Sequence, residues 1–121
     1  MNKKHYFAAG VVFIFAVVIV STGLVRAQEK GIDPSYHDYI SEYNKGDHNA
    51  AYYVGIAFYH GFFKAPYDLE KALEWFLKAA DKGNPEACLK LGDMYSYGRG
   101  VTINKQNAMQ WYRKAAEKDN A

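Results

Sequence analysis

Apolar residues in the second half of the chain recur at the spacing of an α-helix. One stripe, with members three, four, seven and eight residues from the first, consists of Ala72, Trp75, Phe76, Ala79 and Ala80. A shorter stripe precedes it and consists of Ala51, Val54, Gly55 and Phe58. Such spacing places all members of a stripe on one side of a helix. The pattern therefore predicts two amphipathic helices joined by a turn.

Both stripes occur a second time further along the chain. Trp75 is matched by Trp111, 36 residues later, and Gly55 is matched by Gly92, 37 residues later, so the loop between the helices is one residue shorter in the second copy. Self-similarity with a period of 20–50 residues is typical of a solenoid, in which each unit buries its apolar side by stacking on the next. We expect an all-α fold, a short α/α solenoid wound as a right-handed superhelix, after an N-terminal signal or anchor segment.

Polar residues mark the expected helix starts. Asn84 is a good N-cap for the first helix of the second copy, and Asp68 and Asn104 can cap the second helices. Glycine inside a helix costs ~1 kcal/mol relative to alanine. Gly55 and Gly92 therefore indicate a close approach of two helices, and we expect a tryptophan of the partner helix to lie across each glycine.

The chain is expected to divide into five parts. These are a signal peptide or uncleaved membrane anchor (1–27), a flexible leader (28–34), a capping helix (35–46), repeat 1 (47–83) and repeat 2 (84–121).

The N-terminal segment has the layout of a secretory signal. Two lysines precede a run without charge, His5–Val25, and Arg26 ends it. Cleavage after Ala27 would leave Gln28 as the new N-terminus. Since ~20 apolar residues can also span a bilayer, a retained anchor is the alternative. In either case we expect export, with the rest of the chain periplasmic or secreted, or held at the inner membrane facing the periplasm.

Charge and candidate chemistry exclude several function classes. The chain has 15 Lys and Arg against 13 Asp and Glu; three of the basic residues lie in the first 27, leaving 15 − 3 = 12 basic residues against 13 acidic ones. This balance does not predict nucleic-acid binding, which needs a concentrated basic patch.

His37, His48 and His60 fall on three different expected elements, so neither a metal nor a cofactor is predicted. Cys88 matches Ala51 and is expected to be a small buried residue rather than a reactive thiol. Without a nucleophile–base pair or a carboxylate dyad, we predict a protein that is not an enzyme.

The second copy carries a spaced motif. Its members are Ala87, Leu91, Gly92, Tyr95, Gly98, Gly100, Val101, Ala108, Trp111, Tyr112, Lys114, Ala115 and Ala116. Through this motif the chain resembles the Sel1-like repeat family, whose α/α units are related to tetratricopeptide repeats. The first copy departs from the motif at Val54 and over 62–64. The resemblance covers about 47–119 and implies a protein-interaction scaffold, often in the bacterial envelope or in secretory compartments.

Positions that differ between the copies are the candidates for partner binding, because packing positions repeat. On the first helices these candidates are Tyr52, Tyr53, Ile56, Tyr59 and His60, with Lys90, Asp93 and Tyr97 in the second copy. First helices usually line the concave surface of an α/α solenoid, and tyrosine provides a large contact area with few rotors. The expected partner is a peptide or helix of an envelope protein. Packing between repeats is the alternative role for some of these residues.

A second function remains open from the sequence. About three repeats are usually needed for stability, and no polar helix follows the second copy. The uncapped C-terminal end could therefore stack on a second copy of the chain or complete another repeat protein. The membrane would be a partner only through the N-terminal segment, if it is not cleaved.

Overall fold

The computed structural model describes residues 34–119, which form α-helices and, within that range, no β-strand. The helices are α3 (Tyr36–Asn44), α4 (Ala50–His60), α5 (Leu69–Asp81), α6 (Pro85–Tyr97) and α7 (Lys105–Asp119). All of them belong to one compact unit, 35–121. The expected signal segment (1–27) and, apart from Pro34, the expected leader lie outside the described residues.

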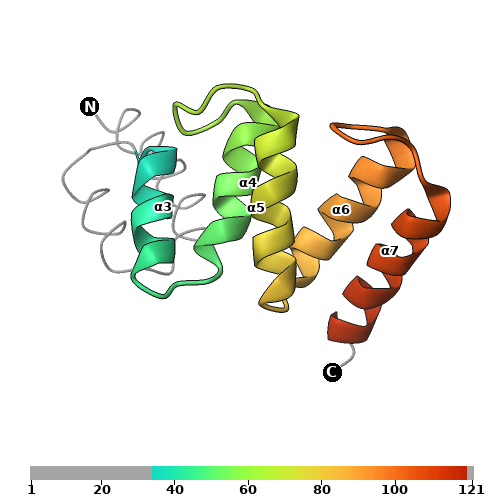
Figure 1. The fold of residues 1–121 in the computed structure, drawn as a ribbon. Helices are drawn as coiled ribbons and strands as arrows, with labels where there is room; N and C mark the ends of the chain where they lie inside the picture. The colour runs from blue at the N-terminus through green and yellow to red at the C-terminus, as the bar shows by residue number, and fades with distance from the viewer. Residues whose placement is uncertain (1–33, 120–121) are drawn as a thin grey trace, which may run out of the picture. The chain divides into compact units, whose positions relative to one another are not determined.

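The helices follow one another in space in the order of the chain (Figure 1). The helices α4 and α5 form one hairpin, α6 and α7 form the next, and α5 contacts α6 where the hairpins meet. The short helix α3 packs on α4 ahead of the first hairpin. Contacts between neighbours along the chain are the mark of a solenoid, so the predicted all-α solenoid fold is confirmed.

Local capping starts the helices where the sequence predicts. Asp68, Asn84 and Asn104 each accept, through a side-chain oxygen, a hydrogen bond from the backbone N–H three residues on, at 2.8–3.0 Å. Each bond satisfies an N–H that has no partner inside the helix. Gly61 and Gly98 end α4 and α6 in the left-handed conformation, with φ of 70° and 69°. Glycine adopts this conformation without the cost that a Cβ atom imposes.

Each hairpin is closed by the same backbone hydrogen bond. The N–H of Asp68 donates to the carbonyl oxygen of Phe58 at 2.9 Å, and the N–H of Asn104 donates to that of Tyr95 at 2.9 Å. The first pair is ten residues apart and the second is nine. The one-residue difference between the copies is therefore absorbed in the loop, and the helices on either side keep equivalent positions.

The longer loop of the first hairpin has a strained backbone. Phe63 and Lys64 have φ of 53° and 64°, although neither is glycine; Gly100, at the place equivalent to Phe63, has φ of 73°. The Phe63 carbonyl accepts a hydrogen bond from the N–H of Tyr36 at 2.8 Å, and its ring lies 4.9 Å from that of Tyr39. These contacts hold the loop against α3 and stabilise a conformation that costs roughly 1–2 kcal/mol per residue on its own.

The two helical glycines mark a close approach of the helices within each hairpin. A Cβ atom built on Gly55 would lie 2.5 Å from the ring of Phe76, and one built on Gly92 would lie 2.5 Å from the ring of Tyr112. The predicted close approach is therefore confirmed. The expectation that a tryptophan lies across the glycine is wrong, because the ring belongs to the residue after it.

The tryptophans face the junctions between successive units. One residue along a helix is a rotation of about 100°, so when Phe76 faces α4 its neighbour Trp75 faces elsewhere. The Trp75 ring lies 5.4 Å from that of Tyr43 on α3 and is half-buried. Trp111 is also half-buried. The apolar stripe groups each tryptophan with residues that pack inside a hairpin, whereas the structure places both tryptophans between units.

Candidate protein-interaction face

The predicted binding residues lie on one side of α4 and of α6. We call this set the variable face; it consists of Tyr52, Tyr53, Ile56, Tyr59, His60, Lys90, Asp93 and Tyr97. His60 and Tyr97 are exposed, Tyr59 is buried, and the remaining members are half-buried. The other side of both helices packs in the core. The structure therefore brings the eight residues to one face but gives them unequal access to a partner.

Tyr59 joins the two repeats. Its ring has the Lys90 ammonium 5.4 Å away and the Arg99 guanidinium 5.8 Å away, a geometry that favours cation–π attraction. Only 8% of its surface is exposed. Tyr59 thus positions the basic side chains of the second repeat beside α4, and offers little area of its own.

A basic and aromatic cluster forms where α4 ends. The imidazole of His60 stacks on the ring of Phe62, with centroids 4.8 Å apart and planes 20° apart. Burial lowers the pKa of His60, and the positive charges of Lys90 and Arg99 lower it further. Phe62 is 51% exposed, which makes it an available apolar surface next to these cations.

Sequence reasoning missed Phe62 and Arg99 as members of this cluster. Both follow the glycine that ends a first helix, and their N–H groups donate to Ala57 and Met94 in the same way, at 2.9 Å each. They therefore occupy equivalent positions and differ between the copies. The rule that selected the variable face would have selected them too, had it been extended past the helix ends into the loops.

The opposite end of the variable face is acidic. Burial raises the pKa values of Tyr52 and Tyr53, and the negative charge of Glu86 raises both further. Tyr53 also lies 5.7 Å from the ring of Tyr39 on α3, so it is partly a packing residue. An occupant of this face would meet carboxylate charge at one end and ammonium and guanidinium charge at the other.

Asp93 has a structural bond within the second hairpin. Its carboxylate accepts a hydrogen bond from the hydroxyl of Tyr112 at 2.6 Å. Burial and this bond raise the pKa of Tyr112 to about 12. Asp93 therefore holds α7 against α6 at the level of Gly92.

The histidines and the cysteine within residues 34–119 lie at surface and packing positions. No group of three His, Cys, Asp or Glu side chains there is placed to hold a metal. His37, His48 and His60 are exposed. Cys88 is buried, as predicted, and burial raises its pKa, which disfavours a thiolate. No helix in this range combines the length and the apolar character that crossing a membrane requires.

Comparison with known proteins agrees with this architecture. The model of the Sel1 repeat matches residues 48–84 and again 85–120. Over 78 residues the chain is 37% identical to the ERAD-associated E3 ubiquitin-protein ligase component HRD3A of Arabidopsis thaliana, a match that covers 64% of this chain and 12% of that protein. The crystal structure of a Sel1 repeat protein from Oxalobacter formigenes is similar with a TM-score of 0.65 and 27% identity, over 70% of this chain and 34% of that one. The chain thus spans only a small part of the length of either protein.

Proposed function

Because the chain belongs to the Sel1 repeat family, whose repeats generally mediate protein–protein interaction, we propose that it is an exported interaction module of a bacterial cell envelope. The proposal rests on one contrast. The hydrogen bonds that shape the two hairpins are repeated, whereas the side chains of the variable face are not. The hydrogen bonds that close the two hairpins and cap their second helices are equivalent, whereas His60 and Tyr97, at matching places on the variable face, differ and are exposed. Repeated packing with divergent exposed side chains is the pattern expected of a surface that recognises one particular partner.

The charge pattern of the variable face supports an elongated occupant. Glu86 lies near one end, and Lys90 and Arg99 lie near the other beside exposed Phe62. A peptide or helix with an acidic and an apolar residue at one end would match this arrangement in a single orientation. Complementary charge contributes mainly to orientation and association rate, while the aromatic side chains contribute contact area.

Site-specific photo-crosslinking in living cells tests this function. A photoreactive amino acid is placed at His60 or at Tyr97, with Glu70, exposed on α5, as the matched control. We expect one defined crosslinked protein from the first two positions and none from the third. Equal yields from all three positions would contradict the proposal.

A loss-of-binding variant follows from the burial pattern. We expect Tyr97→Ser to lower the crosslinking yield at His60 without changing the melting temperature, since Tyr97 is exposed. Tyr53→Ser is less useful, because its contact with Tyr39 makes a loss of stability the expected result.

Export is tested at the N-terminus. N-terminal sequencing of the protein from the cell envelope is expected to start at Gln28. An intact Met1 in the membrane fraction would favour the anchored form facing the periplasm, and an intact chain in the cytoplasm would contradict export.

Self-stacking is the second candidate function, and one observation favours it. Met109 and Ala116 on α7 are exposed, although their counterparts on α5, Leu73 and Ala80, are half-buried. Within the described residues no helix covers this side of α7. Light scattering over a range of concentrations distinguishes the two functions, because a monomer at all concentrations would contradict self-stacking and leave the interaction module standing.

A further inference from the structure

The two junctions between successive units use the same tryptophan but different neighbours. At the first junction, the ring of Tyr43 meets that of Trp75 edge-on, at 5.4 Å and 85°, and the ammonium of Lys78 lies 4.2 Å from the Trp75 ring. At the second junction, the ammonium of Lys114 lies 4.5 Å from the Trp111 ring in the same way. The tryptophan–lysine pair is therefore the same at both junctions. The junctions can then be compared by the residue of the preceding unit that meets the tryptophan.

Backbone hydrogen bonds identify which residue stands where Tyr43 does. The N–H of Gly46 donates to the Tyr43 carbonyl oxygen at 3.0 Å, and the N–H of Gly83 donates to the Ala80 carbonyl oxygen at 2.9 Å. Both glycines have positive φ and follow the last turn of a helix. Ala80 thus occupies the position of Tyr43, and the second junction lacks the phenol ring.

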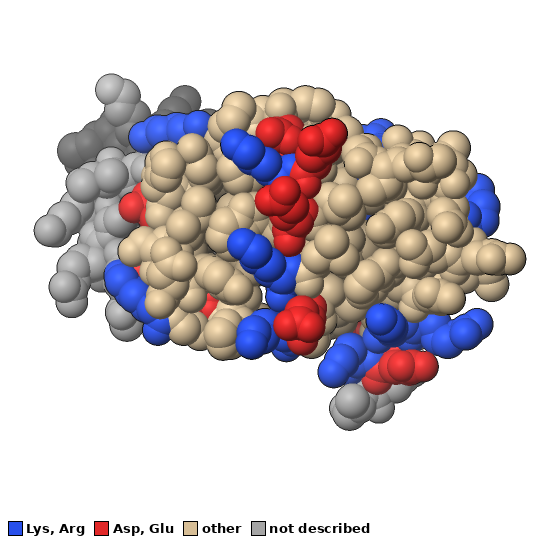
Figure 2. All heavy atoms as spheres, viewed as in Figure 1, with Lys and Arg blue, Asp and Glu red and all other residues tan. Residues whose placement is uncertain are grey.

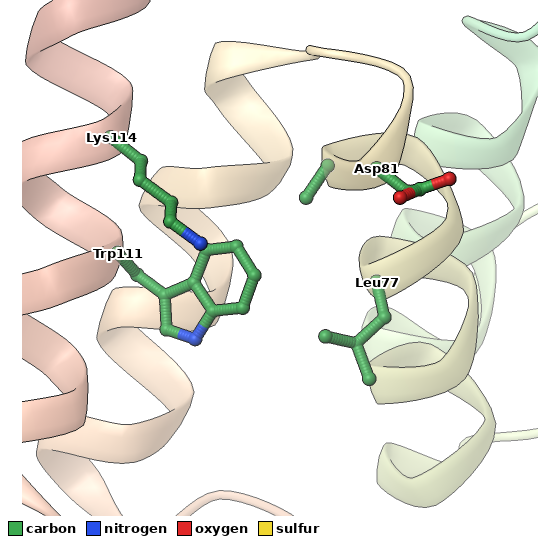
Figure 3. Close-up of a pocket in the computed structure, with 5 residues that line it drawn as sticks. Leu77, Asp81, Trp111 and Lys114 are labelled. Carbon is green, nitrogen blue, oxygen red and sulfur yellow. The ribbon is translucent and has the colours of Figure 1, made fainter.

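A cavity of about 490 Å³ is found at this junction. Its lining consists of Leu77, Ala80, Asp81, Trp111 and Lys114. Figure 3 shows Trp111 and Lys114 projecting from α7 on one side and Leu77 on α5 opposite them. Leu77 is 38% exposed, so an apolar part of the lining is open to water.

We propose that this cavity binds the tyrosine side chain of a partner polypeptide. The first junction supplies the template, since there the same tryptophan–lysine pair packs against Tyr43 from the neighbouring unit. The volume lies within the roughly 300–1,000 Å³ of ordinary ligand pockets, enough for a ring and part of the adjoining chain.

The rim of the cavity favours a neutral aromatic group. The lining has one positive side chain, Lys114, and one negative side chain, Asp81, so it carries no formal net charge. Figure 2 shows Lys and Arg interspersed with Asp and Glu along α5, a mostly uncharged surface over α6 and the first part of α7, and a mainly basic group of side chains at the C-terminal end of α7. A phenol, with an apolar ring and one hydroxyl, matches this lining better than a phosphorylated side chain, which would need an excess of positive charge.

Binding is tested by NMR on the full chain, which has two tryptophans whose indole N–H signals report on the two junctions. The probes are p-cresol and a pentapeptide of glycine and serine with one central tyrosine, with the alanine-centred pentapeptide as control. We expect both tyrosine-like probes to shift the Trp111 signal saturably and to leave the Trp75 signal in place, because Tyr43 already covers it. No saturable shift at Trp111, or equal shifts at both tryptophans, would overturn the proposal.

Reciprocal variants test whether the absence of a tyrosine ring at position 80 is what allows the probes to bind beside Trp111. Ala80→Tyr is expected to fill the cavity and abolish the shift at Trp111, while Ala116→Tyr, at the equivalent exposed position on α7, is expected to leave it unchanged. Tyr43→Ala is expected to create a second site, so that p-cresol also shifts Trp75. If Ala80→Tyr binds the probes like the wild type, or if Tyr43→Ala gains no shift at Trp75, the proposal fails. These variants lie outside the variable face, so either result is separable from the test of the proposed function.

Discussion

Replacing Gly55 by alanine tests the closeness of the helices in the first hairpin. Two effects oppose each other. Alanine in a helix interior gains ~1 kcal/mol over glycine, which would stabilise α4. The new Cβ atom, however, would lie 2.5 and 2.6 Å from two carbons of the Phe76 ring. Since carbon atoms pack at about 3.5 Å or more, the ring would have to retreat by about 1 Å.

Phe76 has no free space into which to retreat, because it is fully buried. Overpacking of a closed core typically costs about 1–3 kcal/mol, and here the strain falls in the upper part of that range. After the gain in helix propensity is subtracted, we expect Gly55→Ala to lower the free energy of unfolding by about 1–2 kcal/mol. For a domain of this size that corresponds to a fall in melting temperature of roughly 5–15 °C.

The measurement is urea and thermal unfolding followed by circular dichroism at the helix band. A double-mutant cycle with Phe76→Leu gives the sharper result, because the smaller side chain should relieve the strain and yield a coupling energy of about 1 kcal/mol or more. Gly92→Ala is the matched control. It faces the half-buried ring of Tyr112, which can move outward only at the expense of its hydrogen bond to Asp93, so a loss no larger than that of Gly55→Ala is expected. Stabilisation by Gly55→Ala would refute the close approach of α4 and α5.

Three further predictions follow from particular contacts. Tyr112→Phe removes the 2.6 Å hydrogen bond to Asp93 and should lower the unfolding free energy by about 1 kcal/mol in urea titrations; no change would mean that water replaces the bond fully. Lys64→Gly should raise the melting temperature, because the left-handed conformation at φ of 64° costs a non-glycine residue roughly 1–2 kcal/mol, whereas Lys64→Val should lower it. The pKa of His60 is lower in the folded chain than in the unfolded one, so the unfolded state binds the proton more tightly; stability should be full above about pH 6.5 and fall as the pH drops through the lowered pKa. The urea midpoint of His60→Gln should not show this fall at low pH. Identical pH profiles of the urea midpoint for the wild type and His60→Gln would contradict the assignment of the fall to His60.

Much of the fold could be predicted because it is set by local interactions. The N-caps Asp68, Asn84 and Asn104 bond only to residues three positions away, so their role can be read from a short stretch of sequence. The same holds for the helical stripes, since an i, i+3, i+4 pattern defines a face without reference to the rest of the chain. Repetition then adds long-range information, because matching stripes imply matching neighbours.

The candidate site could be predicted only in part. The differing positions were found by aligning the copies, and the structure places them on one side of α4 and α6. The burial of Tyr59 depends on Lys90 and Arg99 reaching it from the next unit, and the role of Asp93 depends on Tyr112 of α7. Neither contact has a signature in the local sequence.

The sequence by itself determined the helices, their caps, their repetition and the positions at which the copies diverge. Only the tertiary structure decided which aromatic ring faces each glycine and what each tryptophan meets at a junction. The physical reason is rotation about the helix axis: a stripe of apolar residues is wide enough to allow either Phe76 or Trp75 to face α4, and only the packing of the helices selects between them. The sequence shows that Ala80 stands at the position equivalent to Tyr43. Only the stacking of successive units shows that this difference leaves a cavity beside Trp111.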